Sequence, residues 1–279
     1  MDKLQGLGEE LQGLDIVITR PYAQAEPWAQ RLQELGAKTY IIPLLEIIPV
    51  KDPAQIRAIQ NCILDFDLYS KAIFVSQNAV EHAFEWIDNY WPQLPIGIDF
   101  FAVGEATAQQ IALQGARVTD LAQSQSGAMT SETLLQSPGL QNVAGEKIII
   151  FRGVGGRPHL GETLKARGAQ VDYCELYERR LPANAVEQFT SIKQEIVIKR
   201  TYVVVLHSGE ALENLQQVLQ QELQSEKKLK EKIVLLVPSA RVLELAKAAG
   251  FTQIYTAQNA TDISMLQGLM DLKRNLTAT

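Results

Sequence analysis

Small polar residues and glycines follow several apolar runs of this chain, at points where a strand would end and a helix would begin. A helix that starts at such a turn leaves its first backbone N–H groups without partners inside the helix, and its dipole favours a negative charge there. Helix starts therefore bind carboxylates and phosphates without needing basic side chains. The pattern predicts an anion-binding site. Its candidate residues are Thr19, Arg20, Ser76, Gln77, Asn78, Gly104, Glu105, Thr107, Arg152, Gly153, Ser208, Gly209 and Ser239. For Ser76, Thr107 and Ser208, the alternative is that the hydroxyl only caps a helix.

The segment 147–180 indicates how such a turn is positioned. Residues 148–151 form a short apolar run rich in β-branched side chains, which is typical of a strand covered on both faces. Glycines then allow a tight turn, Leu160 and Leu164 keep helical spacing, and Gly168 marks the helix end. This order predicts one βαβ unit of a parallel sheet. In a doubly wound sheet such turns collect at the carboxyl ends of the strands, where ligands bind.

The same unit recurs near the amino terminus at a fixed offset. Arg20 and Arg152 are 132 positions apart, and the run 72–76 matches 204–208 at the same offset. Further along, the offset drifts only to 134 and then 135 positions. This period is far longer than the roughly 20 to 50 residues of solenoid repeats. The chain is therefore predicted to be an internal duplication, an α/β protein with two similar doubly wound parallel-sheet domains.

The composition excludes several classes of protein. The chain has 279 residues, enough for two domains, and its net charge of −6 gives no long-range attraction for nucleic acid or an anionic membrane. We find neither a secretory signal nor a run of about 18 apolar residues, so we expect a cytoplasmic protein. Cys62 and Cys174 lack CxxC spacing and are expected to be small buried residues, not a structural disulfide. The three histidines are scattered, so no metal is expected.

Common nucleotide-binding and hydrolase motifs are missing from the sequence. It contains no GxxxxGK[ST] loop and no GxSxG elbow. The turn FRGVGGR is not GxGxxG, yet Asp172 follows Gly153 by 19 positions, close to where a ribose-binding acid would stand. A nucleotide-dependent oxidoreductase therefore stays open as one alternative. A two-lobed protein that binds an anionic metabolite without turnover is another.

Two extended, partly charged segments follow the two βαβ units. These segments, 45–51 and 177–183, each contain a proline, which suits an edge strand or a linker, and we expect them to be linker strands. We also expect residues 1–13 to be a tail and residues 209–230 to form one long polar helix.

Taken in order, VITRP, FVSQNAV, AVGEATA, GEKIIIFRG, ELYERR and VPSARVLELAKAAGF resemble the motifs of the uroporphyrinogen-III synthase family, over about residues 14–269. The resemblance implies a cofactor-free lyase of tetrapyrrole and heme biosynthesis. Its substrate would be the linear tetrapyrrole hydroxymethylbilane, which loses water and closes with inversion of the last pyrrole ring to give uroporphyrinogen III. The resemblance also implies a monomer that contacts the preceding pathway enzyme transiently. One domain would be discontinuous, 14–44 with 184–279, and the other, 52–176, inserted, with the active site in the cleft.

The family's implicated catalytic side chain is a tyrosine, matched here by Tyr177 in ELYERR. By resemblance, its hydroxyl would donate to the departing oxygen of the bilane, and the bilane's eight carboxylates would explain many backbone donors in an acidic protein. The sequence departs from the family in having Val75 where threonine is commoner, and His207 stands before Ser208. The alternative for Tyr177 is simple packing, with Tyr173 as its nearest competitor.

Overall fold

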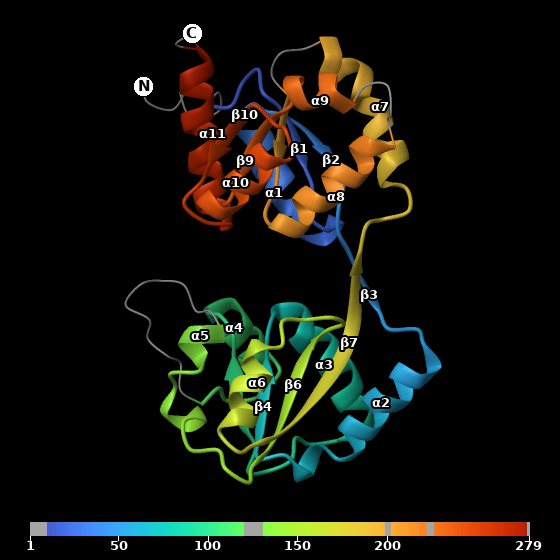
Figure 1. Cartoon of the computed structure of the whole chain (residues 1–279), viewed down its shortest axis with the longest axis vertical. Coiled ribbons are helices and arrows are strands. Elements are labelled where there is room, and N and C mark those ends of the chain that lie inside the picture. Colours follow the sequence, from blue (N-terminus) through green and yellow to red (C-terminus); the bar gives the residue numbers. More distant parts are fainter. Residues whose placement is uncertain (1–9, 120–130, 199–201, 222–225, 278–279) are drawn as a thin grey trace. The chain divides into compact units, whose positions relative to one another are not determined.

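The structure is a computed structural model, and it describes residues 10–119, 131–198, 202–221 and 226–277. In this described part the strands form two five-stranded sheets (Figure 1). The chain divides into two compact units, unit 1 (Met1–Glu46 and Arg180–Thr279) and unit 2 (Ile47–Arg179). Among the described residues, no helix combines the length and the apolar character that crossing a membrane requires.

Unit 1 contains a sheet with the strand order β10-β9-β8-β1-β2, in which neighbouring strands run parallel. Its elements are β1 (Asp15–Ile18), α1 (Tyr22–Glu34), β2 (Lys38–Ile41), α7 (Ala185–Ile198), β8 (Tyr202–Val205), α8 (Gly209–Gln220), α9 (Glu226–Lys232), β9 (Val234–Val237), α10 (Ala240–Ala248), β10 (Gln253–Thr256) and α11 (Asp262–Thr277).

Unit 2 contains a sheet with the order β3-β7-β6-β4-β5, and its strands β7, β6, β4 and β5 are parallel. β3 lies beside β7, where the Val50 N–H donates to the Leu176 carbonyl at 3.2 Å. The elements are β3 (Glu46–Pro49), α2 (Pro53–Leu64), η1 (Phe66–Leu68), β4 (Lys71–Phe74), α3 (Gln77–Tyr90), β5 (Asp99–Ala102), α4 (Glu105–Leu113), α5 (Ser131–Leu134), η2 (Pro138–Leu140), β6 (Lys147–Gly153), α6 (His159–Ala166) and β7 (Gln170–Arg180).

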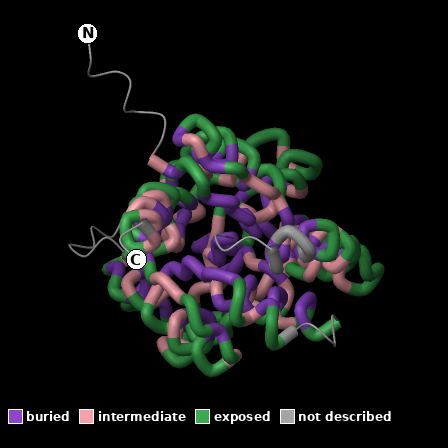
Figure 2. The backbone as a smooth tube through the Cα atoms, turned by 90° about the horizontal axis from the view of Figure 1, so that it is seen from above, coloured by how far each residue is buried: buried purple, intermediate pink, exposed green. Residues whose placement is uncertain are grey.

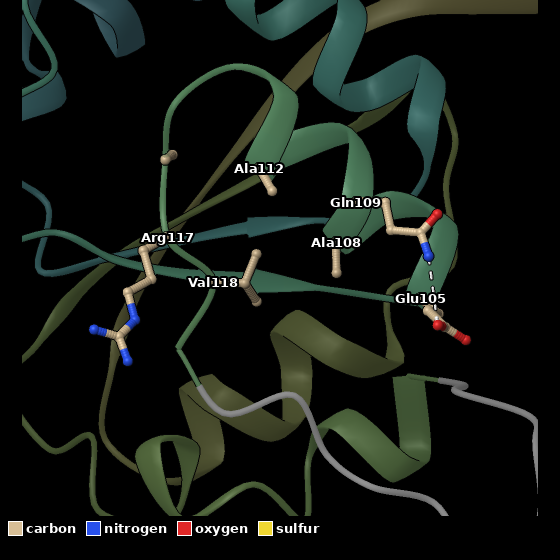
Figure 3. A pocket seen from close by; sticks show the side chains of 7 residues that line it. Glu105, Ala108, Gln109, Ala112, Arg117 and Val118 are labelled. Carbon is tan, nitrogen blue, oxygen red and sulfur yellow. Dashed lines mark hydrogen bonds between the residues drawn. The ribbon is translucent and has the colours of Figure 1, made fainter.

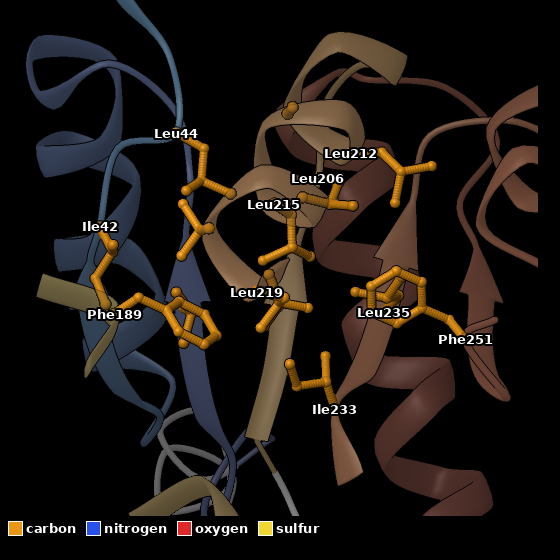
Figure 4. Packing of buried hydrophobic residues seen from close by; sticks show 14 of the residues in the cluster. Ile42, Leu44, Phe189, Leu206, Leu212, Leu215, Leu219, Ile233, Leu235 and Phe251 are labelled. Carbon is orange, nitrogen blue, oxygen red and sulfur yellow. The ribbon is translucent and has the colours of Figure 1, made fainter. Parts of the chain in front are cut away.

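Side-chain alternation along the strands explains why helices cover both faces of each sheet. In β1, Ile16 and Ile18 pack in the cluster that includes α1 and α11, whereas Val17 packs in the cluster that includes α7, α8 and α10. Figure 4 shows this second cluster, with Phe189 and Leu215 reaching from the helices toward the sheet. A strand covered on both faces is apolar throughout, as the sequence runs predicted, and β1, β4, β8 and β9 are buried along their whole length. Figure 2 marks buried residues in purple.

The duplication predicted from the sequence is visible in the strand order. β1, β2, β8 and β9 match β6, β7, β4 and β5 in sequence, and the orders β9-β8-β1-β2 and β5-β4-β6-β7 are equivalent. The helix ends match as well: Gly36 after α1 and Gly168 after α6 have φ of 86° and 90°, a left-handed conformation that glycine adopts without steric cost. The predicted α/β class with two similar parallel sheets is confirmed.

Some predicted element boundaries differ from the structure. β7 is one continuous strand that runs into the segment expected to be a linker, because β3 hydrogen-bonds along it. The helix expected over 209–230 is two helices, α8 and α9, and the second buries Leu229 in the core of unit 1. In the tail expected over 1–13, residues 1–9 lie outside the described residues. Leu11 has no exposed surface and its N–H donates to the Leu35 carbonyl at 2.8 Å, so the tail prediction is wrong for Leu11.

Candidate functional site

The hydroxyl groups of Ser76 and Tyr177 meet in unit 2, with 2.9 Å between Oγ and Oη. Ser76 follows β4 and caps α3, and its Oγ accepts a hydrogen bond from the Ala79 N–H at 3.1 Å. Tyr177 stands on β7 and is only 2% exposed. Because the serine oxygen is already anchored to the backbone, the hydrogen bond between the two hydroxyls holds the phenol in a fixed position.

A β-bulge and a glycine position the Tyr177 ring. Pairing of β6 with β7 proceeds residue by residue as far as Arg152 opposite Glu175, but the next pair is Gly153 opposite Tyr177, so Leu176 is an extra residue. Bulges re-aim side chains, and here Leu176 and Tyr177 both enter the same core cluster. A Cβ added at Gly153 would lie 2.7 Å from Cε2 of Tyr177. Glycine at this position therefore leaves the space that the ring occupies.

Arg152 is engaged in a local network. Its Nη2 and Nε donate to Oε1 of Glu175 at 2.7 and 3.0 Å, and its guanidinium lies 4.0 Å from the centroid of the Tyr173 ring. The Gly155 N–H donates to the same carboxylate oxygen at 3.2 Å. With 12% of its side chain exposed and its charge compensated by Glu175, Arg152 mainly fixes the glycine turn.

A cavity of about 290 Å³ adjoins the hydroxyl pair and the glycine turn, and we call it the unit 2 cavity. Its lining includes the hydroxyl-bearing residues Ser76, Ser131, Tyr173 and Tyr177 and the arginines Arg152, Arg157 and Arg179. Guanidinium groups next to hydroxyls and glycine backbone suit a ligand with carboxylate groups. The cavity thus collects four residues that the sequence predicted, namely Ser76, Arg152, Gly153 and Tyr177.

A larger hollow of about 770 Å³ lies along α4 (Figure 3). Its lining is mainly aliphatic, with Ala108, Ala112 and Val118, and of the predicted residues it includes Glu105. Glu105 accepts a hydrogen bond from Gln109 Nε2 at 3.4 Å. The unit 2 cavity is the better candidate despite its smaller size, because several hydroxyl and guanidinium groups converge on it.

The remaining predicted residues of unit 2 lie at the starts of α3 and α4. They are Gln77, Asn78, Gly104 and Glu105. Gly104 is the residue before α4 and has φ of 98°. Thr107 lies inside α4, is 4% exposed, and donates through Oγ1 to the Val103 carbonyl at 2.8 Å. The alternative interpretation of Thr107 as a helix cap is therefore wrong, and its hydroxyl is occupied within the fold.

In unit 1, Ser208 and Ser239 cap α8 and α10, which follow β8 and β9. Their Oγ atoms accept from the N–H groups of Ala211 and Val242 at 3.1 and 3.4 Å. Gly209 is buried as the first residue of α8. Capping of α3 and α8 by Ser76 and Ser208 agrees with the alternative that these hydroxyls cap helices.

Thr19 and Arg20 follow β1 and are both engaged. Thr19 is 2% exposed, and its hydroxyl donates to the Val205 carbonyl at 2.7 Å, which ties β1 to β8. Arg20 forms an ion pair with Asp262 and donates to the Ala260 carbonyl at 3.3 Å. These contacts stabilise the carboxyl end of the unit 1 sheet.

His207 lies beside this turn with its ring edge-on to Trp28, 5.4 Å between centroids. Both ring nitrogens are buried and lack a hydrogen-bond partner among the described residues. Burial, and next the positive charge of Arg20, lower the pKa of His207 to about 3. The imidazole is therefore neutral at neutral pH.

The described residues fit poorly with a nicotinamide or metal site. Asp172 stands opposite Ile149, near the beginning of β7, whereas the glycine turn follows Gly153 at the end of β6. Four strand residues separate the two positions, about 13 Å along the sheet, so Asp172 does not reach a ribose bound at the turn. Its Oδ2 instead accepts from the Tyr69 hydroxyl at 2.8 Å. Within the described ranges, no group of three or more His, Cys, Asp or Glu side chains gathers to hold a metal ion.

Fold and site together define a class, a duplicated α/β protein with hydroxyls, a glycine turn and arginines gathered at a cavity of one unit. The family model described as uroporphyrinogen-III synthase HemD matches residues 26–267. The chain is 34% identical over 261 residues to the uroporphyrinogen-III synthase of Escherichia coli (strain K12), covering 92% of this chain and 100% of that protein. It is 32% identical over 258 residues to the Salmonella typhimurium (strain LT2) enzyme of the same name, again covering 92% and 100%.

A crystal structure of a mutant uroporphyrinogen III synthase from Thermus thermophilus superposes with a TM-score of 0.61 at 14% identity, covering 96% of this chain and 100% of that chain. At this identity the likeness shows the fold alone. The matches in sequence show more: the chain belongs to the uroporphyrinogen-III synthase family.

Sequence reasoning missed three polar residues of the unit 2 cavity, Ser131, Arg157 and Arg179. Arg157 and Arg179 stand in FRGVGGR and ELYERR, the motifs that also contain Gly153 and Tyr177. Nothing in their spacing showed that both border one cavity, because that depends on the pairing of β6 with β7.

Proposed function

We propose that this chain is a uroporphyrinogen-III synthase, a lyase that removes water from hydroxymethylbilane and closes the linear tetrapyrrole with inversion of its last pyrrole ring. The observation that carries the proposal is the hydrogen-bonded pair of Ser76 and Tyr177 beside a cavity lined by three arginines. Membership of the family supports the same activity.

Tyr177 is the proposed donor to the departing hydroxyl of the bilane. The C–O bond of the hydroxymethyl group breaks, its electron pair goes to oxygen, and electrons from the pyrrole nitrogen form the azafulvene. The oxygen takes up a proton and leaves as water, and the pyrrole nitrogen gives up its own proton, so that the azafulvene is neutral and the net change is the loss of one water. A tyrosine hydroxyl assists this step by donating a hydrogen bond, and it adds no negative charge next to the carboxylates of the substrate. Ser76 keeps the phenol in place, because its own oxygen is anchored at the start of α3.

The second task is to hold a flexible chain with its last ring turned over. We assign the carboxylates of the bilane to Arg157 and Arg179 and to the helix starts that follow Ser76 and the glycine turn. Arg152, paired with Glu175, keeps that turn in place. Holding the reacting ends together in this way lowers the activation free energy, because binding has already met most of the entropic cost of bringing them together.

Further expectations belong to the proposal. The enzyme would work as a monomer in the cytoplasm without an added cofactor. It would meet the enzyme that makes the bilane only transiently. The net charge of −6 gives it no general attraction for nucleic acid.

The deciding experiment is incubation with freshly prepared hydroxymethylbilane, followed by separation of the product isomers. The uncatalysed reaction gives the type I isomer without ring inversion, so we expect the protein to divert the product to type III with no metal or cofactor added. Type I product alone at high protein concentration would end the synthase proposal. Tight binding of the bilane together with type I product would favour a binding protein without turnover.

A further inference from the structure

The imidazole of His82, on α3, packs beside the phenol ring of Tyr177, with 5.4 Å between the ring centroids and 35° between the ring planes. The His82 side chain is 13% exposed, whereas that of Glu85, one turn further along the same helix, is 61% exposed. The imidazole therefore lies toward the core of unit 2. Its Nδ1 is 3.1 Å from Oε2 of Glu85. Because an ionised carboxylate can only accept a hydrogen bond, Nδ1 carries a proton, and this bond restricts rotation of the imidazole.

The other contacts of the Tyr177 ring show what His82 adds. The Tyr177 hydroxyl is held by Ser76 Oγ at 2.9 Å, and a Cβ added at Gly153 would lie 2.7, 3.0 and 3.2 Å from Cε2, Cζ and Cδ2 of the ring. A ring held only at its hydroxyl could still tilt about that point. The close approach of Gly153 restricts this tilt at one edge, and the imidazole restricts it further, since tilted aromatic pairs at this separation attract each other. α3 thus supplies both the partner of the hydroxyl and a neighbour of the ring.

We propose that His82 is a positioning residue for Tyr177. Its imidazole, oriented by Glu85, packs against the phenol ring and keeps the hydroxyl directed at the departing oxygen of the bilane. The inference rests on the proposed function, because it assigns His82 to the step in which Tyr177 donates. His82 is not among the described residues that line the unit 2 cavity, so its effect on the substrate passes through Tyr177.

Steady-state kinetics separate positioning from binding. His82→Ala should lower kcat for type III product by about threefold to tenfold and change the Michaelis constant by less than about twofold, because a misplaced donor slows the chemical step. His82→Phe restores an aromatic ring at this position and should recover most of the lost kcat. Tyr90→Ala is the matched control on the same helix, since it removes a ring that stacks on Trp86 at 6.3 Å between centroids, and it should keep the wild-type kcat.

A double-mutant cycle tests whether the effect passes through the phenol. In the Tyr177→Phe background there is no hydroxyl to position, so adding His82→Ala should reduce the rate little further. An equal fold loss in both backgrounds would overturn the proposal, and so would an unchanged kcat in folded His82→Ala. All rates are taken per folded molecule, as measured by circular dichroism. His82→Leu, which fills the space without an aromatic ring, replaces the alanine variant if that variant does not fold.

Nuclear magnetic resonance of the full-length protein, with ¹³C in the tyrosine rings, gives a readout that needs no substrate. The Tyr177 signal is the one missing from Tyr177→Phe. It should shift in His82→Ala, because the ring loses its aromatic neighbour and changes its tilt, and it should stay in place in Tyr90→Ala. An unshifted signal in folded His82→Ala would overturn the positioning role. Wild-type protein that forms no type III product would instead end the synthase proposal, and the Tyr177 signal would still decide whether His82 holds the phenol.

Discussion

The Tyr177 hydroxyl is held by Ser76 from a segment 101 positions earlier in the chain, and Gly153 leaves room for its ring. Three elements therefore fix one phenol: the start of α3, the end of β6 and the bulge in β7. A side chain positioned by so many elements at the edge of a polar cavity is well placed for chemistry. Packing alone would not require the hydroxyl pair.

Tyr177→Phe should reduce turnover of hydroxymethylbilane by about one to two orders of magnitude, at the low end of the usual contribution of a general acid. The bilane is already reactive, so the activity should not vanish. The measurement is the initial rate of type III product, with circular dichroism to establish folding. Tyr173→Phe is the matched control, because Tyr173 lines the same cavity but its hydroxyl donates to the Pro158 carbonyl at 3.4 Å, and this variant should keep most of the rate. An unchanged rate and isomer ratio in folded Tyr177→Phe would remove this residue from the mechanism.

Gly153→Ala should lower the rate through Tyr177 without touching its hydroxyl. The new Cβ would stand 2.7 Å from Cε2 of Tyr177, so the ring must shift and its hydrogen bond with Ser76 should be disturbed. Gly268→Ala in α11 is a matched steric insertion in unit 1, where the Cβ would lie 2.9 Å from Cδ1 of Leu236. Both variants should lose stability in urea unfolding, by about 1 to 3 kcal/mol for overpacking. Only Gly153→Ala should also form less type III product per folded molecule. An equal loss of product in Gly268→Ala would contradict the role of Gly153 in positioning Tyr177.

Sequence periodicity was sufficient to predict the two sheets, because strands covered on both faces leave unbroken apolar runs and helix ends leave glycines such as Gly36 and Gly168. The bulge at Leu176 could not be predicted in this way. Leu176 and Tyr177 can both be buried in the core, so the apolar pattern of the sequence does not reveal that one residue is added to the strand. The hydrogen bond from the Thr19 hydroxyl to the Val205 carbonyl could not be predicted either, because it depends on which strand lies beside β1.

Arg157→Gln should weaken binding of the bilane, whereas Arg152→Gln should mainly disturb the glycine turn. Arg157 is exposed at the cavity, and loss of one charge-assisted hydrogen bond costs about 1 to 3 kcal/mol of binding free energy. Arg152→Gln leaves Glu175 without its cation, so the free energy of unfolding should fall as well. Michaelis constants and urea unfolding separate the two effects. Arg31→Gln, at an exposed ion pair on α1, should change neither.

Residues 47–179 should fold when expressed alone. This segment carries a five-stranded sheet that is complete apart from Glu46 and Arg180, and it has two core clusters of its own. Residues 180–279 alone should not fold, because they lack β1 and β2, and β1 lies between β8 and β2 in the unit 1 sheet. Cooperative urea unfolding by circular dichroism is the measurement. A stable fold for 180–279, or an unfolded 47–179, would contradict the assignment of the two units as domains.

His207 should make the protein less stable as the pH falls below about 6.5. The folded-state pKa of about 3 lies below the ordinary value of 6.5, so the unfolded chain takes up the proton first. The neutral imidazole therefore contributes its full stability above pH 6.5, and this is lost progressively as the pH drops toward 3. Each pH unit within this window costs about 1.4 kcal/mol, which gives roughly 3 kcal/mol between pH 7 and pH 4 from this group.

Urea unfolding at several pH values measures this loss as the difference between wild type and His207→Gln, in which the titrating group is absent. The free energy of unfolding of the variant should fall less steeply as the pH drops. Glutamine does not titrate, so unfolding no longer exposes a side chain that takes up a proton in this pH range. His159→Gln, at an exposed position at the start of α6, should keep the wild-type slope. Parallel curves for wild type and His207→Gln would mean that solvent reaches the imidazole in the folded protein, and that the burial of its ring nitrogens does not control the stability of unit 1.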